Sequence, residues 1–278
     1  MKGRSSSAFR PQVRRLCALA GLSSLLWNFL PPTGPVAVPK HADAAGVAGY
    51  HTRLEGPQEL LAVLAGRGTC PRSLEGLNDL VYRAVAHGPS PLVRPTDNWF
   101  AWMLGLGWSD AWVTQNPRRL ARMGVGLCSD AVIILREVLG RSGYSSEMLD
   151  LHGHVVCRVR LPEGIWILDP DFGLVFDGDL DQFTEAAAQG ATGHRLRDLG
   201  HGARRIDAYR EIASRATNAS VVTEGVLNPR LARLEGLLNI VAWVVPAMLL
   251  GCSLLWPRSS TQPPASQVSC GGTRDSST

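Results

Sequence analysis

The sequence predicts an α+β fold that contains an apolar helix beginning at Cys128 and a β-hairpin that carries His154 and Asp169. Two observations predict it. Apolar residues recur at helical spacing after Cys128, and two short β-prone runs flank a turn between His154 and Asp169. These elements carry a thiol, an imidazole and a carboxylate, so the predicted fold also defines a candidate site.

The helix is predicted from its apolar spacing and from the glycines around it. Gly124–Leu127 is a poor helix segment, and Gly140 and Gly143 end the run. A helix N-terminus would point unpaired N–H groups and positive potential at Cys128, which favours a thiolate and can stabilise an oxyanion. The apolar positions follow i, i+3, i+4, i+7, i+8: Ala131, Ile134, Leu135, Val138 and Leu139.

The two strands are predicted from composition. His154–Arg160 is rich in β-branched residues, and Ile165–Asp169 is a short apolar run. Leu161–Gly164 between them has Pro second and Gly fourth, which is the chemistry of a type I turn. We therefore expect a β-hairpin that turns at these four residues.

The register of this hairpin decides whether the imidazole and the carboxylate can meet. If Arg160 pairs with Ile165, Asp169 faces Val156, and His154 lies two residues along on the same face. A slip of one residue would place the two groups on opposite faces of the sheet. The turn therefore predicts that His154 and Asp169 are diagonal neighbours.

Cys128, His154 and Asp169 then form a set suited to nucleophilic catalysis. A thiolate attacks a carbonyl, an imidazole takes and returns the proton, and a carboxylate holds the imidazole in the required tautomer. Asp171 follows Pro170, where the strand is expected to have ended. We therefore expect substitution of Asp171 to be milder than substitution of Asp169.

Three short motifs resemble the transglutaminase-like superfamily, in a bacterial membrane-anchored form. They are Gly126-Leu127-Cys128 opening an apolar helix, Gly153-His154-Val155, and Trp166–Pro170. The resemblance covers roughly Asp97 to Phe176. It implies a papain-like core, in which a Cys-bearing helix packs on an antiparallel sheet carrying His and Asp.

The resemblance implies that Cys128 is the nucleophile, His154 the general acid and base, and Asp169 the residue that orients the imidazole. Two positions depart from the family pattern. Ser129 follows the Cys where cross-linking members usually have Trp, and Val156 stands where many members have an aromatic residue. These departures favour hydrolysis of an amide or ester, through a thioester, over protein cross-linking.

The resemblance also implies a second oxyanion donor upstream of the Cys. Asn98, Trp99 and Gln115 are the candidates, and the sequence does not separate them. The aromatic stretch Asp97–Trp112 contains two of them. We expect it to be a core helix that packs against the Cys helix, and one wall of a substrate groove is the alternative.

A zinc site is the alternative chemistry for these residues. His152 and His154 alternate onto one strand face and could bind zinc together with Cys128 and Asp169. A cysteine at a helix start is unusual in such a site, and no CxxC pair accompanies it. The sequence therefore predicts no metal and no cofactor.

We expect the remaining cysteines and histidines to pack in the core or lie at the surface. Cys157 alternates onto the strand face opposite His154, so we expect it to pack in the core. The sequence does not decide whether Cys70 and Cys157 form a disulfide. His87 and His201 stand in loop contexts, and we expect both at the surface.

Composition and charge exclude a nucleic-acid partner. The chain has 278 residues, 45% hydrophobic and 19% charged, which indicates a globular protein that leans towards membrane association. Its net charge of +4 comes from the ends, because Met1–Arg15 carries five basic residues and no acid. The body is near neutral and lacks the basic face that nucleic acid needs.

Two apolar segments predict a membrane anchor. Leu237–Trp256 has twenty residues without a charge, which is the length of a transmembrane helix. Leu16–Leu30 is a signal peptide or an uncleaved signal anchor, and the basic residues before it place the N-terminus in the cytoplasm. The body would then be extracytoplasmic. The expected divisions are a basic and apolar N-terminus with a linker (1–49), a helical subdomain (50–96), the catalytic core (97–203), an amphipathic helical linker (204–236), the transmembrane helix (237–256) and a disordered tail (257–278).

The sequence thus predicts a membrane-anchored thiol enzyme. Its substrate would be a peptide, a protein or a cell-envelope polymer, and its oligomeric state is left open. The rival class is a non-catalytic module that keeps the fold and binds a membrane or cell-envelope partner at the same groove.

Overall fold

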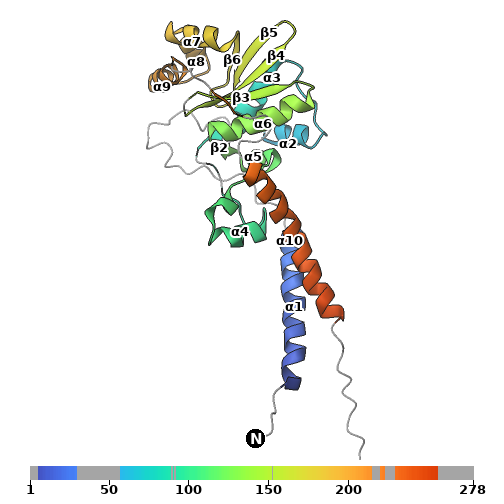
Figure 1. The fold of residues 1–278 in the computed structure, drawn as a ribbon. Coiled ribbons are helices and arrows are strands. Elements are labelled where there is room, and N and C mark those ends of the chain that lie inside the picture. The colour runs from blue at the N-terminus through green and yellow to red at the C-terminus, as the bar shows by residue number, and fades with distance from the viewer. Residues whose placement is uncertain are drawn as a thin grey trace, which may run out of the picture.

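The computed structural model describes residues 6–29, 57–88, 90, 92–151, 153–214, 220–222 and 229–255. Within them the chain forms ten α-helices and a central antiparallel sheet, which confirms the predicted α+β class. Figure 1 shows a body that contains the sheet and a pair of long helices, α1 and α10, that projects from it.

The helices are α1 (Ser6–Phe29), α2 (Pro57–Leu64), α3 (Leu74–Ala84), α4 (Trp99–Gly105), the short 3-10 helix η2 (Ser109–Trp112), α5 (Pro117–Met123), α6 (Cys128–Arg141), α7 (Leu180–Ala188), α8 (Ala191–Asp198), α9 (Ala203–Ser214) and α10 (Pro229–Leu255). The strands are β1 (Ala86–His87), β2 (Val125–Gly126), β3 (Ser146–Asp150), β4 (Val155–Leu161), β5 (Gly164–Asp169), β6 (Leu174–Asp177) and β7 (Ser220–Val222).

The sheet is built around the predicted hairpin. Its strand order is β6-β5-β4-β3-β7, and each neighbouring pair is antiparallel. Arg160 pairs with Ile165 across β4 and β5, so the predicted register is confirmed. Because side chains alternate along a strand, this register fixes which residues of the hairpin share a face.

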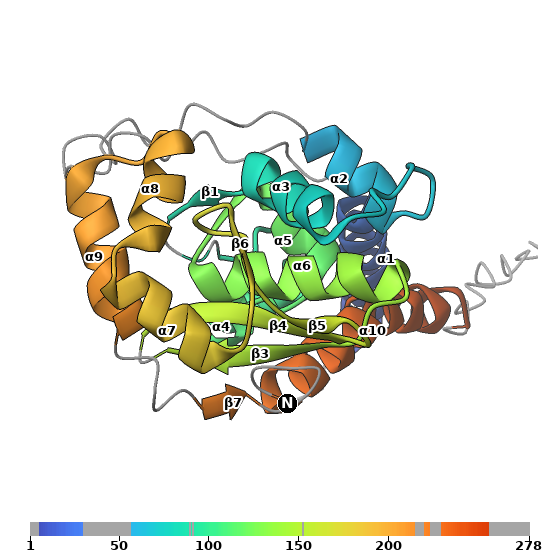
Figure 2. The same ribbon diagram turned by 90° about the horizontal axis from the view of Figure 1, so that it is seen from above.

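Helices cover both faces of the sheet. Because side chains alternate along each strand, each strand contributes residues to the core on either face. Met148, Cys157 and Leu168 belong to the core that contains α6 and α3. Their neighbours Leu149 and Ile167 belong to a second core with α7, α8 and α9 (Figure 2). Part of the expected linker 204–236, namely α9, therefore packs on the sheet and belongs to the body.

The start of α6 is fixed by close packing around Gly126. The Asp130 carboxylate accepts hydrogen bonds from the backbone N–H of Leu127 at 3.0 Å and from the hydroxyl of Ser90 at 2.6 Å. A Cβ at Gly126 would lie 2.7 Å from the Cβ of Asp130, so only glycine fits there. These contacts hold the backbone immediately before Cys128 in place, as a helix cap does.

The helices α1 and α10 form an antiparallel pair. Arg14 Nε donates to the carbonyl oxygen of Ser253 at 2.6 Å, and Asn28 Nδ2 donates to that of Ala242 at 2.9 Å. Gly21 allows the close approach between these two contacts, because a Cβ there would lie 2.9 Å from Leu250 Cγ. Small residues serve this purpose in many packed membrane helices.

Among the described residues, one helix is long and apolar enough to cross a membrane, namely Arg230–Leu255 of α10. The helix begins before the predicted Leu237, and its first turns are docked on the body. The buried guanidinium of Arg119 forms an ion pair with Glu235, Nη1 to Oε1, at 2.8 Å. The body and the apolar helix are therefore joined by a rigid contact.

The aromatic stretch Asp97–Trp112 differs from the expectation. It forms α4 and η2, which pack against α10, and it forms neither a core helix against α6 nor a wall of the pocket described below. Trp102 and Trp108 are 37% and 46% exposed. Aromatic residues at helical spacing predicted the helix but could not predict its neighbour.

Candidate functional site

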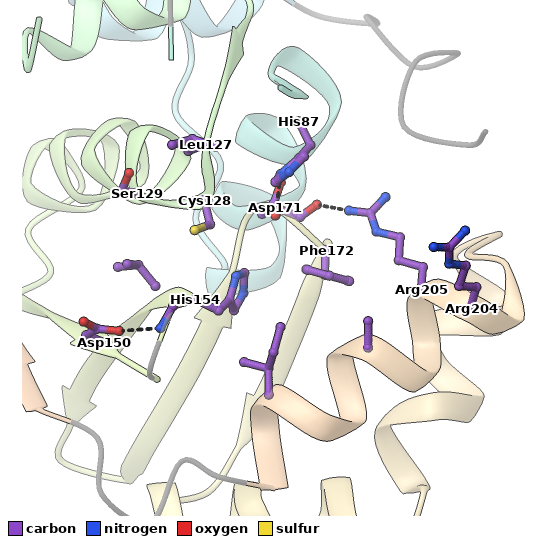
Figure 3. A pocket seen from close by; sticks show the side chains of 14 residues that line it. His87, Leu127, Cys128, Ser129, Asp150, His154, Asp171, Phe172, Arg204 and Arg205 are labelled. Carbon is purple, nitrogen blue, oxygen red and sulfur yellow. Dashed lines mark hydrogen bonds and ion pairs between the residues drawn. The ribbon is translucent and has the colours of Figure 1, made fainter. Parts of the chain in front are cut away.

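Cys128, His154 and Asp169 come together as predicted. Cys128 is the first residue of α6, His154 immediately precedes β4, and Asp169 ends β5. His154 Nε2 lies 2.6 Å from Asp169 Oδ2, and the two residues are only 3% and 1% exposed. The sulfur of Cys128 points toward the His154 ring (Figure 3). Since Nε2 is bound to Asp169, Nδ1 is the ring nitrogen left to the thiol.

The Asp169 carboxylate is held by the loop that follows it. Oδ1 accepts hydrogen bonds from the backbone N–H groups of Asp171 and Phe172, both at 3.1 Å. Burial opposes ionisation, but the His154 charge and these hydrogen bonds lower the pKa of Asp169 below its ordinary value. The buried Tyr209 hydroxyl adds to this lowering, although no well-aligned hydrogen bond joins it to a described residue.

His154 is biased towards its protonated form. Burial lowers its pKa, but the charge of Asp169 and the hydrogen bonds to Asp169 and Cys128 outweigh burial and raise the pKa well above the ordinary value. The rings of Phe172 and Tyr209 pack against the imidazole with centroids 5.3 and 5.9 Å away. The imidazole is therefore shielded from most solvent, and the adjacent carboxylate stabilises its protonated form.

A pocket of about 620 Å³ opens in front of Cys128 and His154. One wall comes from α9, whose Arg204 and Arg205 face the pocket (Figure 3). The guanidinium of Arg205 donates to the backbone oxygen of Asp171 at 3.0 Å and lies 4.3 Å from the centroid of Phe172. The other lining residues are His87, Leu127, Ser129, Asp150, Gly153, Val155, Ala208 and Ile212.

A second histidine–aspartate pair lines the same pocket, and the sequence did not reveal it. His87 Nδ1 donates to Asp171 Oδ1 at 2.8 Å. Asp171 follows the strand end, as predicted, and its side chain is only 4% exposed; that its substitution is milder than that of Asp169 stays a prediction. Strand β1 places His87 opposite Gly126, two residues before Cys128. Only this parallel pairing, distant in sequence, brings His87 to the pocket.

His201 also differs from its expected surface position. It is 7% exposed, and its Nε2 donates to the backbone oxygen of Phe172 at 2.8 Å. Burial and the nearby Arg205 charge lower its pKa. His201 therefore supports the loop that carries Phe172. A histidine in a polar loop gave no sequence signal for this contact.

The three predicted oxyanion residues lie elsewhere, and that expectation is corrected. Asn98 Nδ2 donates to Asn239 Oδ1 at 2.8 Å, Trp99 Nε1 to the Ala242 oxygen at 3.3 Å, and the Gln115 N–H to Glu235 at 2.9 Å. None of the three lines the pocket. The family pattern implied an oxyanion donor upstream of Cys128, but in this structure these three upstream residues bind α10.

The structure bears on the Cys70–Cys157 disulfide, the position of Cys157 and the zinc alternative, for the residues that it describes. Cys70 and Cys157 are free thiols, so no disulfide joins them. Cys157 is buried, as predicted, and burial raises its pKa to about 12. No cluster of three or more His, Cys, Asp or Glu suited to a metal occurs in the described parts of the chain. His152 of the zinc alternative lies outside them.

The fold and the site together define an α+β protein with a buried His–Asp pair facing a helix-start cysteine. No family model, no curated protein and no solved structure matches the chain. The chemical reading of the site therefore depends on its geometry.

Proposed function

We propose that the protein is a membrane-anchored, transglutaminase-like thiol enzyme with a papain-like core, which acts on amide or ester bonds. The observation that carries the proposal is the buried 2.6 Å contact between His154 and Asp169 beside a cysteine that opens into a pocket. Burying two charges costs free energy, so a buried His–Asp pair is a candidate for function. A cysteine nucleophile needs both groups, because the imidazole accepts the thiol proton and the carboxylate orients the imidazole.

The reaction follows from the order of these groups. The Cys128 sulfur attacks the substrate carbonyl carbon, and the backbone N–H groups at the start of α6 stabilise the oxyanion. His154 then donates its proton to the leaving amine or alcohol, and a thioester remains. Water attacks the thioester, His154 takes a proton from that water, and the acid product leaves as the thiolate re-forms.

Hydrolysis is favoured over transfer to a protein amine. Ser129 follows the cysteine where cross-linking members of the superfamily usually have Trp, and Val156 replaces an aromatic residue. Val156 is fully buried in the sheet and does not line the pocket. Water is then the simplest acceptor for the acyl group.

The pocket also favours a substrate with a negative charge near the acyl group. Arg204 is exposed at the pocket rim, and the described residues offer its side chain no hydrogen bond or ion pair. Arg205 lies beside it on the same helix. The carboxylate of Asp171 is already paired with His87. A carboxylate of the substrate, as in an acidic peptide or envelope polymer, would complement the two arginines.

The helix pair supports an extracytoplasmic body. Because α1 and α10 are antiparallel and project from the body, Ser6 of α1 and Leu255 of α10 would lie on one side of a membrane and the body on the other (Figure 1). Met1–Arg15 carries five basic residues, and basic segments stay in the cytoplasm. Protease added to intact spheroplasts should cut the body; complete protection would contradict this orientation.

A thiol-modification experiment tests the chemistry and separates it from a binding module. Iodoacetamide should label Cys128 faster than Cys70 at pH 6, as read by peptide mass mapping, because the Cys128 sulfur faces the His154 imidazole, which can take the thiol proton. His154→Ala should slow this labelling and abolish hydrolysis of an activated ester. If parent and His154→Ala label Cys128 equally and neither turns over the ester, the binding module is the correct class.

A further inference from the structure

We propose that an apolar platform on α4, the turn between α4 and η2, and the residue after η2 lies in the membrane interface, so that the body rests on the bilayer. The inference goes beyond the proposed reaction but depends on the proposed α1–α10 anchor. We define the platform by five side chains within a short stretch of the chain: Trp102, Met103, Leu106, Trp108 and Val113.

The platform is unusual because it exposes large apolar side chains together. Leu106 is 64% exposed and Met103 is 49% exposed, and both tryptophans expose more than a third of their surface. Single exposed apolar residues are normal on proteins, but a group of this kind marks a surface that contacts a partner or a lipid phase. None of the five side chains lines the candidate active site.

The position of the platform indicates lipid as the partner. Trp99, at the start of α4, donates to the backbone oxygen of Ala242, and Asn98 contacts Asn239, so α4 is fixed to α10. Figure 1 shows α4 beside the place where α1 and α10 leave the body. The segment that carries the platform is thus held beside the apolar helix pair, and tryptophan is enriched at the membrane interface.

The length of the helix pair supports the same conclusion. The charge-free part of α1, from Leu16 to Phe29, rises only about 20 Å at about 1.5 Å per residue. The part of α10 below the α4 contact, from Ala242 to Leu255, has a similar length. The hydrocarbon core of a bilayer is about 30 Å thick. The whole charge-free part of α10, from Leu237 to Leu255, is close to that thickness, and the α4 contacts at Asn239 and Ala242 fall inside it. A bilayer that covers this part of α10 therefore reaches α4 and the platform.

The test uses full-length protein reconstituted in phosphatidylcholine–phosphatidylglycerol vesicles, with and without lipids brominated near the headgroup end of the acyl chains. Bromine quenches tryptophan fluorescence on contact. The Trp102→Phe/Trp108→Phe variant should lose part of the lipid-dependent quenching that the parent shows. Trp166→Phe is the matched control, because Trp166 lies in β5 of the body, and it should keep that quenching.

Two further measurements distinguish the ways of failing. If alkaline carbonate releases the parent from vesicles, the anchor itself is wrong, and the platform proposal is overturned with it. If the parent stays inserted while Trp102 and Trp108 are quenched by aqueous acrylamide and not by brominated lipid, the platform alone is overturned. If Leu106→Cys is cross-linked efficiently to a second copy, the platform is a protein interface, which also overturns the proposal.

Discussion

The imidazole of His87 donates a hydrogen bond from Nδ1 to the carboxylate of Asp171 at 2.8 Å, and both side chains line the pocket that holds His154. This pair joins β1, which flanks the backbone leading to Cys128, to the loop whose N–H groups hold Asp169. Two histidine–aspartate pairs therefore support one site, and the second pair connects the elements that carry the nucleophile and the carboxylate.

We expect His87 and Asp171 to stabilise the fold through their interaction with each other. Asp171→Ala and His87→Ala should each lower the free energy of unfolding by about 1–3 kcal/mol, because each removes the hydrogen bond between the buried carboxylate and the His87 imidazole. The double variant should cost less than the sum of the two. Thermal melts in detergent measure this, with substitution of the exposed His194 of α8 by Ala (His194→Ala) as the control. Additive losses would show that the two residues act independently.

The triad residues should differ in the severity of their substitutions. Cys128→Ala should abolish ester hydrolysis, and His154→Ala should be nearly as severe, because the leaving group loses its proton donor. Both variants should melt close to the parent if only chemistry is lost. Turnover of an activated ester alongside a thermal melt tests this. Parent-like turnover in Cys128→Ala would exclude the thioester route.

Asp169→Asn should retain the fold but reduce turnover by about a hundredfold or more. The Asn oxygen can keep the two backbone hydrogen bonds that Asp169 Oδ1 accepts. Its amide nitrogen would then face His154 Nε2 and place the imidazole proton on Nδ1, toward Cys128. That tautomer cannot accept the thiol proton. Unchanged turnover in this variant would remove Asp169 from the mechanism.

The His154–Asp169 pair predicts a defined pH window for stability. The raised pKa of His154 adds stability that is present below about pH 6.5 and is lost as pH rises through the folded value. The lowered pKa of Asp169 adds stability that is present above about pH 4 and is lost as pH falls through its folded value. The stability difference between parent and Asp169→Asn should therefore be largest from about pH 4 to 6.5. Melts across this range measure it, and a pH-independent difference would contradict the pair.

Arg204 should affect substrate choice and leave the chemistry unchanged. Arg204→Gln should raise KM for an activated ester with a nearby carboxylate by about threefold, since one exposed charge pair contributes about 1 kcal/mol or less. It should leave KM for a neutral ester unchanged. Arg197→Gln on α8 is the matched control, because Arg197 is exposed and does not line the pocket. Equal effects on both esters would show that the pocket does not read substrate charge.

The sequence by itself determined the α+β class, the helix start at Cys128, and the hairpin register that brings His154 to Asp169. These features are local. Apolar spacing, flanking glycines and the chemistry of a short turn act over a few residues, and a register error would have reversed every side chain of the hairpin.

Only the tertiary structure decided which distant segments complete the site. His87 reaches the pocket through a parallel pairing of β1 with β2, and Arg204 through the packing of α9 on the sheet. Asn98, Trp99 and Gln115 were drawn instead to α10 by polar contacts. Helical spacing in the stretch Asp97–Trp112 predicted a helix but not what that helix packs against. An amphipathic helix of one sequence can pack against a core, another helix or a lipid surface. The choice among these depends on contacts between residues more than a hundred positions apart.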